Sequence, residues 1–185
     1  MPKILYFPVE DREIFEALSP GELILIRGRL LGARDATHRR MLELLDQGRD
    51  LPVPLEGECL YYVGPSPAPP GKMIGAAGPT TAYRMDPYTP RLLELGLAAT
   101  MGKGPRGPEV REAIKRHRAL YLATFGGAGA YLARRITSVR VLAFEDLGPE
   151  ALLELEVENF PAVVINTPSG EDYYQEVLRR AGSLG

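Results

Sequence analysis

The chain has 185 residues, 45% of them hydrophobic, so it is long enough to bury one good core, and we expect a single domain spanning residues 1–185. Its formal net charge of −2 disfavours general nucleic-acid binding. No apolar run approaches the roughly 20 residues of a membrane span, and acidic residues interrupt the N-terminal segment where a signal peptide would be apolar. The sequence therefore predicts a cytoplasmic protein that binds neither membrane nor nucleic acid.

Cys59 is the only cysteine, which excludes a disulfide within the chain. An iron–sulfur cluster needs about three or four thiolates, and a structural zinc site needs about four Cys or His ligands. The two histidines, His38 and His117, lie far from Cys59 in the sequence. We therefore expect a buried, inert thiol and no metal site made by this chain, so any metal must come mostly from another chain.

The first predicted elements are a strand, a loop and a helix. Residues 22–31 are partly β-branched and are followed by Gly32, as expected of a short strand. Arg34 lies in the following loop, and Asp35 is the expected N-cap of a helix over residues 36–47, whose apolar residues share one face. Arg34 is thus placed where a strand ends.

Strands and helices then alternate, which predicts an α/β protein with a mixed sheet. Thr80 and Thr81 stand at an expected helix start, and the pair Thr89-Pro90 at another. The further strands are expected at residues 58–64, 97–101, 120–124, 136–147 and 152–167, and the further helices at 89–95, 108–118, around 131–132, and 171–182.

Three places combine a glycine turn, a strand end and a cation or hydroxyl. They are Arg34, the segment from Thr80 and Thr81 to Arg84, and Lys103. Ligands of α/β folds usually bind where such strand ends share an edge of the sheet. Two guanidinium forks and one ammonium suit a dianion such as a dicarboxylate, and a threonine at a helix start could help to bind it or to move a proton.

Plainer interpretations stand beside this one. A single loop arginine is more often a solvated surface group, and a threonine at a helix start is more often a cap. His38 is expected on the exposed face of its helix, next to Arg39 and Arg40. Residues 102–107 match GxGxxG, but no acidic residue follows at the spacing that a dinucleotide site requires, so we expect these glycines to let Lys103 approach a ligand.

Several motifs, read together, resemble the C-terminal region of class I fumarases and the β subunits of their two-chain relatives, which include L(+)-tartrate dehydratase. The resemblance covers nearly the whole chain in the family's order, and its combination of motifs is highly specific. It implies the swivelling β/β/α domain, a layered mixed sheet with flanking helices. The motifs are GRLLGARDATHRR (28–40), YYVGP (61–65), GPTTAYRMDPY (78–88), GKG (102–104), YLATFGGAGAYLA (121–133) and LLELEVENFPAVV (152–164).

The resemblance also implies roles for individual residues. Thr80 would be the catalytic base, and Arg34, Arg84 and Lys103 would bind the substrate. A threonine hydroxyl is a very weak base, so it would need neighbouring cations to stabilise its alkoxide. We expect a supporting set around these residues: Asp35, His38, Gly78, Thr81 and Asp86.

The function implied is that of a hydro-lyase, the β subunit of a two-chain fumarate hydratase that interconverts fumarate and L-malate in the tricarboxylic acid cycle. A 4Fe-4S cluster would be bound by a partner α subunit, in a heterodimer or an α2β2 assembly. One alternative is the β subunit of an L(+)-tartrate dehydratase, although Asp86 and the YL…GG stretch favour fumarase. An alternative of another class is a non-catalytic anion-binding or interaction module.

Overall fold

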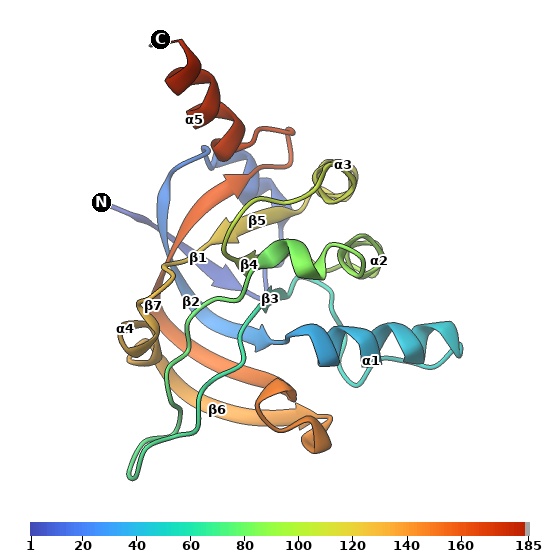
Figure 1. Cartoon of the computed structure of the whole chain (residues 1–185). Coiled ribbons are helices and arrows are strands. Elements are labelled where there is room, and N and C mark those ends of the chain that lie inside the picture. Colours follow the sequence, from blue (N-terminus) through green and yellow to red (C-terminus); the bar gives the residue numbers. More distant parts are fainter. Residues whose placement is uncertain (184–185) are drawn as a thin grey trace.

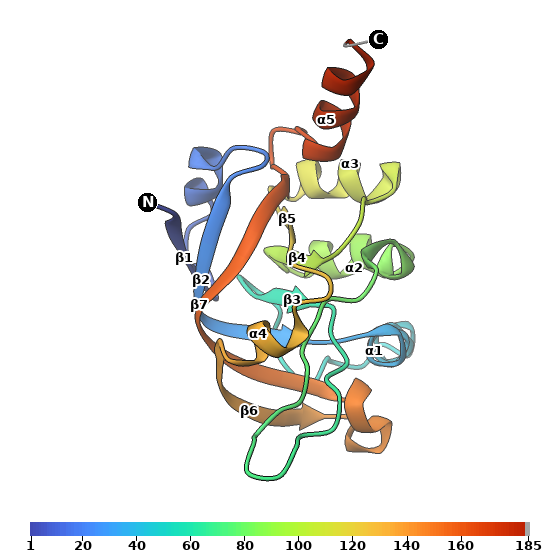
Figure 2. The same cartoon turned by 60° about the vertical axis from the view of Figure 1, so that its left-hand side comes forward.

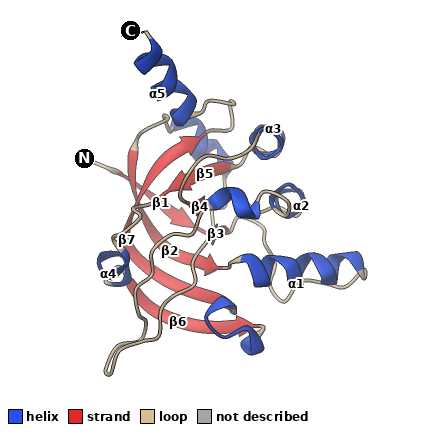
Figure 3. Ribbon diagram, in the orientation of Figure 1, coloured by secondary structure: helices blue, strands red, loops and turns tan. Residues whose placement is uncertain are grey.

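The computed structural model describes residues 1–183, which form a mixed α/β fold around one seven-stranded sheet (Figures 1 and 3). The strand order is β1-β2-β3-β4-β5-β7-β6, and β2 also pairs with β7. The predicted mixed sheet is confirmed. The strands are β1 (Lys3–Phe7), β2 (Leu23–Gly32), β3 (Cys59–Tyr61), β4 (Ala99–Gly102), β5 (Leu120–Ala123), β6 (Ile136–Ala143) and β7 (Leu152–Asn166).

The extra pairing closes the sheet into a barrel, because β7 joins β2 on one side and β5 on the other. The antiparallel ladder between β2 and β7 changes register between Ile26 and Gly28. Opposite this shift, Asn159 has a φ of 50° and its Oδ1 accepts a hydrogen bond from Arg27 Nε at 2.8 Å. Such a bulge bends the paired strands, which helps the barrel to close.

Helices cover one outer side of the sheet. α1, α2 and α3 are stacked along that side, whereas α5 projects from the top of the molecule (Figures 1 and 2). The helices are α1 (Asp35–Asp46), α2 (Thr89–Glu94), α3 (Pro108–Arg116), α4 (Gly129–Ala133) and α5 (Tyr173–Gly182), with the 3-10 helices η1 (Arg12–Ala17), η2 (Ala82–Met85) and η3 (Glu145–Glu150).

The apolar side chains form two cores, one on each side of the barrel wall. Leu30 of β2 belongs to the inner core, together with Phe15 and Phe160. The next residue, Leu31, belongs to the outer core, which lies against the helices and includes Met41. Successive strand residues face opposite sides, so β2 contributes to both cores. The outer core packs the helices against the sheet.

Two expectations about the strands were wrong. No strand was expected before residue 22, yet β1 is one, with Leu5 and Phe7 buried and Ile4 and Tyr6 exposed. The strand expected at residues 136–147 ends early, because Phe144 adopts a left-handed φ of 60° and begins η3. Neither feature has a strong local signal, since β1 is short and a phenylalanine rarely adopts positive φ.

Candidate functional site

The segment that carries Thr80 extends the sheet between β3 and β4. Thr80 N–H donates to Tyr62 O at 2.7 Å, Lys103 N–H donates to Thr80 O at 3.2 Å, and Ala82 N–H donates to Lys103 O at 2.9 Å. Thr81 forms an isolated parallel bridge with Lys103. Neighbouring strands lie roughly 4.8 Å apart, so the backbones of Thr80 and Lys103 are held side by side.

Gly102 makes this close approach possible. A Cβ on Gly102 would lie 2.8 Å from the Tyr62 ring and 3.0 Å from Thr80 O. The expected helix start is present, because Thr81 is the N-cap of η2, but η2 is a single 3-10 turn and offers an anion little helix dipole. The Thr80 N–H is already bonded, so only its side chain remains available to a ligand.

Arg34, Asp35 and Arg84 form a cluster after β2. Arg84 Nε and Nη2 donate to Asp35 Oδ1 and Oδ2 at 3.1 and 2.7 Å. Arg34 Nε lies 3.7 Å from Asp35 Oδ2 and 3.8 Å from Glu150 Oε1. Asp35 is the first residue of α1 and not its N-cap, as had been expected, and Arg34 occupies the cap position. Because Asp35 takes the Nε side of Arg84, the Nη1 side of its fork is left for another carboxylate.

The site has more positive than negative charge. Arg34 and Arg84 share the carboxylate of Asp35, and Arg34 also lies near Glu150, whereas within residues 1–183 the Lys103 ammonium makes no salt bridge. The side chains of Arg34 and Arg84 are 30% and 44% exposed. Solvent-borne anions can therefore reach a cluster whose own carboxylates do not neutralise it.

His38 is fully buried, so the prediction that it lies on the exposed face of α1 was wrong. Its Nδ1 lies 2.7 Å from Arg34 O, and because a carbonyl only accepts, Nδ1 carries the proton. The imidazole packs edge-on against Tyr62, with 5.3 Å between ring centroids. Burial lowers the pKa of His38 to about 4, so the ring is neutral near pH 7. The neutral ring holds the backbone of Arg34 through Nδ1 and adds no charge to the site.

Asp86 and Gly78, two residues of the expected supporting set, contact other parts of the chain. Asp86 Oδ2 accepts from Gly107 N–H at 2.7 Å, and Oδ1 lies 2.8 Å from Arg106 Nε. Gly78 packs beside the start of α4, where its Cβ would lie 3.6 Å from Gly129 Cα. Neither residue joins the Arg34–Arg84 cluster through a contact of this kind.

Arg106 was missed by sequence reasoning, although its side chain is 0% exposed and paired with Asp86. It lies within the GxGxxG match, whose glycines and Lys103 carry the more obvious signals of a ligand site. The available signal was an arginine between Pro105 and Gly107, in a turn of small residues. A long side chain at such a place either extends into solvent or is buried with polar partners.

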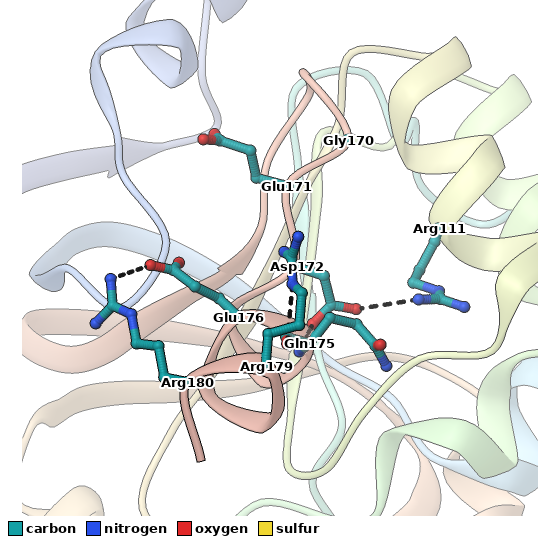
Figure 4. Close-up of a pocket in the computed structure, with 8 residues that line it drawn as sticks. All are labelled: Arg111, Gly170, Glu171, Asp172, Gln175, Glu176, Arg179 and Arg180. Atoms are coloured by element: carbon teal, nitrogen blue, oxygen red, sulfur yellow. Dashed lines mark hydrogen bonds and ion pairs between the residues drawn. The ribbon is translucent and has the colours of Figure 1, made fainter. Parts of the chain in front are cut away.

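A hollow of about 580 Å³ is formed by α3, α5 and the turn before α5 (Figure 4). Four of its charged side chains form two ion pairs. Arg111 Nη1 lies 3.5 Å from Asp172 Oδ2, and Arg180 pairs with Glu176. None of its lining residues belongs to the candidate site, and its own ion pairs leave little charge for a ligand.

Cys59 does not offer a metal ligand. It is 0% exposed in β3, and burial raises the pKa of its thiol well above the ordinary range. Within residues 1–183, no three His, Cys, Asp or Glu side chains are grouped so that they could hold a metal ion. The residues of this chain therefore do not fit an iron–sulfur cluster.

Comparison with known proteins identifies the family of the chain. The family model described as Fumarase C-terminus matches residues 7–177. The chain belongs to the fumarase C-terminus family. Fumarate hydratase 2 of Leishmania major is 39% identical over 160 residues, which are 85% of this chain and 28% of that protein. The anaerobic class I fumarate hydratase of Escherichia coli strain K12 is 36% identical over 157 residues, which are 84% and 29%.

A shorter relative matches almost end to end. A Methanocaldococcus jannaschii chain assigned as an L(+)-tartrate dehydratase subunit beta is 32% identical over 169 residues, 88% of this chain and 87% of that one. The chain thus spans less than a third of the length of these fumarate hydratases but most of this subunit-sized member of the fumarase C-terminus family. None of the helices described here is long and apolar enough to cross a membrane.

Proposed function

We propose that this chain is the β subunit of a two-chain class I fumarate hydratase, which reversibly hydrates fumarate to L-malate. The observation that carries the proposal is the cluster of Arg34 and Arg84 around Asp35 beside the hydrogen-bonded pair of Thr80 and Lys103. Family membership and the names of the relatives add to it. A site with surplus cations at adjoining strand ends suits a small dicarboxylate.

In this proposal Arg34, Arg84 and Lys103 bind the carboxylate and hydroxyl groups of the substrate, and Thr80 moves the proton. Both backbone groups of Thr80 are hydrogen-bonded, to Tyr62 O and Lys103 N, which limits the positions that its hydroxyl can reach. A threonine hydroxyl is a weak base, so proton removal requires the positive field of the neighbouring cations to stabilise the alkoxide. Asp35 then has a positioning role, because it holds the Arg84 guanidinium side-on.

We further propose that a 4Fe-4S cluster is bound by a partner α subunit, in a heterodimer or an α2β2 assembly. Two findings support a separate partner: Cys59 is the only cysteine, and a family member of similar length is assigned as a subunit. The whole chain would act as one swivelling domain in the cytoplasm. Its closed sheet supports movement as a single unit against the partner.

A second candidate is the β subunit of an L(+)-tartrate dehydratase, which the Methanocaldococcus jannaschii relative favours. Asp86 does not separate the two substrates by direct contact, because its carboxylate is engaged by Arg106 and Gly107. Both candidates require the same three cations to bind a diacid.

The proposal is tested by expressing the chain anaerobically with a cluster-bearing partner and assaying fumarate against L-tartrate. We expect the pair to hydrate fumarate and either chain alone to be inactive. Preference for L-tartrate would replace fumarate with the second candidate. A stable pair with an intact cluster that acts on neither diacid would refute the hydro-lyase and leave an anion-binding or interaction module.

A further inference from the structure

A fully buried arginine connects the two turns that carry Arg84 and Lys103. Arg106 Nε lies 2.8 Å from Asp86 Oδ1, Nη1 donates to Tyr62 Oη at 2.9 Å, and Nη2 donates to Thr89 Oγ1 at 2.7 Å. The guanidinium also stacks over the Tyr62 ring, 5.2 Å from its centroid. Each of its three nitrogens is therefore engaged inside the protein.

The hydrogen-bond directions in this network are determined. Thr89 donates its one hydroxyl proton to Met85 O at 2.9 Å, so its oxygen accepts from Arg106 and from Tyr62, whose Oη lies 3.2 Å away. Tyr62 Oη in turn accepts from Arg106 Nη1. Both hydroxyls therefore donate and accept, whereas Arg106 Nε contacts Asp86 Oδ1 as an ion pair without hydrogen-bond geometry. The hydroxyl bonds restrict the directions of the two Nη groups of Arg106.

The network reaches the backbone of the candidate site at several points. Asp86, which pairs with Arg106, lies two residues after Arg84 and accepts from Gly107 N–H. Lys103 begins the same turn that contains Arg106 and Gly107, and Tyr121 Oη closes this turn by donating to Gly104 O at 2.6 Å.

Tyr62 links the network to the proposed base. Its carbonyl oxygen accepts from Thr80 N–H at 2.7 Å, while its hydroxyl accepts from Arg106. Its ring also packs against His38, which bonds Arg34 O through Nδ1. One buried guanidinium therefore contacts groups that hold Thr80, Arg84 and Lys103.

We propose that Arg106 is a positioning residue that sets Lys103 and Arg84 relative to Thr80, an inference that rests on the function proposed above. A buried ion pair stabilises a fold no better than apolar residues of similar volume, so stability alone does not account for this arrangement. Its planar fork can hold three acceptors in fixed directions, which the point charge of a lysine cannot do. Displacement of a binding group by about 1 Å can cost on the order of 100-fold in rate.

The test compares Arg106→Lys and Tyr62→Phe with the wild type in the reconstituted pair. Arg106→Lys keeps the charge and loses the fork, and Tyr62→Phe removes one acceptor while keeping the ring. We expect kcat/KM to fall about 100-fold in the first and several-fold in the second, in protein that remains folded. Arg111→Lys is the matched control, since Arg111 pairs with Asp172 outside the site and should keep wild-type turnover.

A second readout does not depend on turnover. Titration of the full chain with succinate, followed by amide NMR, should shift the Thr80 and Lys103 resonances in the wild type and not in Arg106→Lys. Wild-type kcat/KM and wild-type shifts in folded Arg106→Lys would overturn the positioning role while leaving the proposed function intact. If the wild-type pair is inactive but succinate still binds in this Arg106-dependent way, the proposed function is refuted and the positioning role stands. If the pair is inactive and succinate does not bind, both proposals are refuted.

Discussion

At the scale of single residues, the proposed role of Arg84 predicts that its loss lowers activity far more than stability. Arg84→Ala should lower kcat/KM at least about 100-fold, because each charge-assisted hydrogen bond to a substrate carboxylate contributes about 1.5–3 kcal/mol. The free energy of unfolding should change by less than about 1 kcal/mol, since Arg84 is 44% exposed and such ion pairs contribute little to stability. Steady-state assays and urea unfolding measure the two quantities.

Arg91 provides the control for this substitution. It is 42% exposed and pairs with Asp46, so it matches Arg84 in exposure and in partner type but lies in α2. Arg91→Ala should leave turnover unchanged. Near-normal activity of Arg84→Ala, or an equal loss in Arg91→Ala, would refute the substrate-binding role of Arg84.

His38 predicts a dependence of stability on pH. Burial places its pKa at about 4, below the ordinary value of about 6.5, so on acidification the unfolded chain takes up the proton first. The stability is thus fully present above about pH 6.5 and is lost as the pH falls towards 4. Between pH 7 and pH 5 the wild type should lose about 2 kcal/mol more than His38→Gln.

Urea unfolding at the two pH values measures this difference. His117→Gln serves as the control, because His117 lies at the end of α3 and outside the buried set, and it should keep the wild-type pH dependence. If wild type and His38→Gln lose the same free energy on acidification, His38 is not buried as a neutral ring.

The sequence predicts some site residues better than others. Arg34, Arg84 and Lys103 stand beside glycine turns, and the rule that ligands bind at strand ends predicts that they meet. The structure brings Arg34 and Arg84 together around Asp35, and the roles of all three stay predictions. Arg106 and the burial of His38 have no such local signal, because they depend on contacts with Tyr62, which is far away in the chain from Arg106. Charged residue types are usually exposed, so a buried arginine is expected only once its partners are known.

At the scale of elements, Gly102 at the end of β4 decides how closely the Thr80 segment can approach. Gly102→Ala should cost about 1–3 kcal/mol in unfolding free energy, because its Cβ would overlap the Tyr62 ring and Thr80 O. The strain should also separate Thr80 from Lys103 and lower turnover. Urea unfolding and activity assays measure both effects.

Gly182→Ala provides the comparison, since in the described chain no atom beyond its chain neighbours and the backbone of α5 lies within 4 Å of its Cβ position. It should leave activity unchanged and keep stability or raise it by up to about 1 kcal/mol. A Gly102→Ala variant with wild-type stability and turnover would show that the close approach is not required.

α5 is expected to contribute little to the fold beyond its first turn. None of its residues is buried, although Tyr173 and Tyr174 pack against the outer core. Truncation after Tyr174 should therefore reduce the unfolding free energy by less than about 1 kcal/mol and preserve one cooperative transition. Tyr173→Ala should cost more, about 2 kcal/mol, because its ring packs against Gly21. The reverse order in urea unfolding would contradict this assignment.

The α-helices were predicted within a few residues because prolines and glycines mark their ends, as at Pro90 and Gly48. Their first residues were less predictable: Asp35 and Thr89 both stand one position inside the helices that they were expected to cap. In each case the side chain bonds elsewhere, to Arg84 and to Met85 O. A tertiary contact at Asp35 and a bond to the preceding turn at Thr89 thus replace the expected capping bonds.

At the scale of the whole molecule, closure of the barrel was not predictable from local patterns. β7 was expected as a strand, but its pairing with β2 joins Leu23 to Val163 and Gly32 to Leu153, across most of the chain length. Alternation along β7 shows only that one face is buried and does not identify its neighbours. The mixed sheet was therefore predictable, whereas its closure depends on long-range pairing.

Closure predicts that the barrel opens as one unit. β7 is hydrogen-bonded to β2 and β6 along its first part and to β2 and β5 near its end, so it cannot leave without breaking several ladders. In native-state hydrogen exchange, the bonded amides of β7 should open with the same free energy as those of β4 and β5, equal to global unfolding. The edge strand β1, which pairs only with β2 in the described chain, should exchange faster by local opening. If β6 and β7 open together at a distinctly lower free energy than β4 and β5, the molecule is an open sheet with a detachable hairpin, and the proposed rigid swivelling unit fails with it.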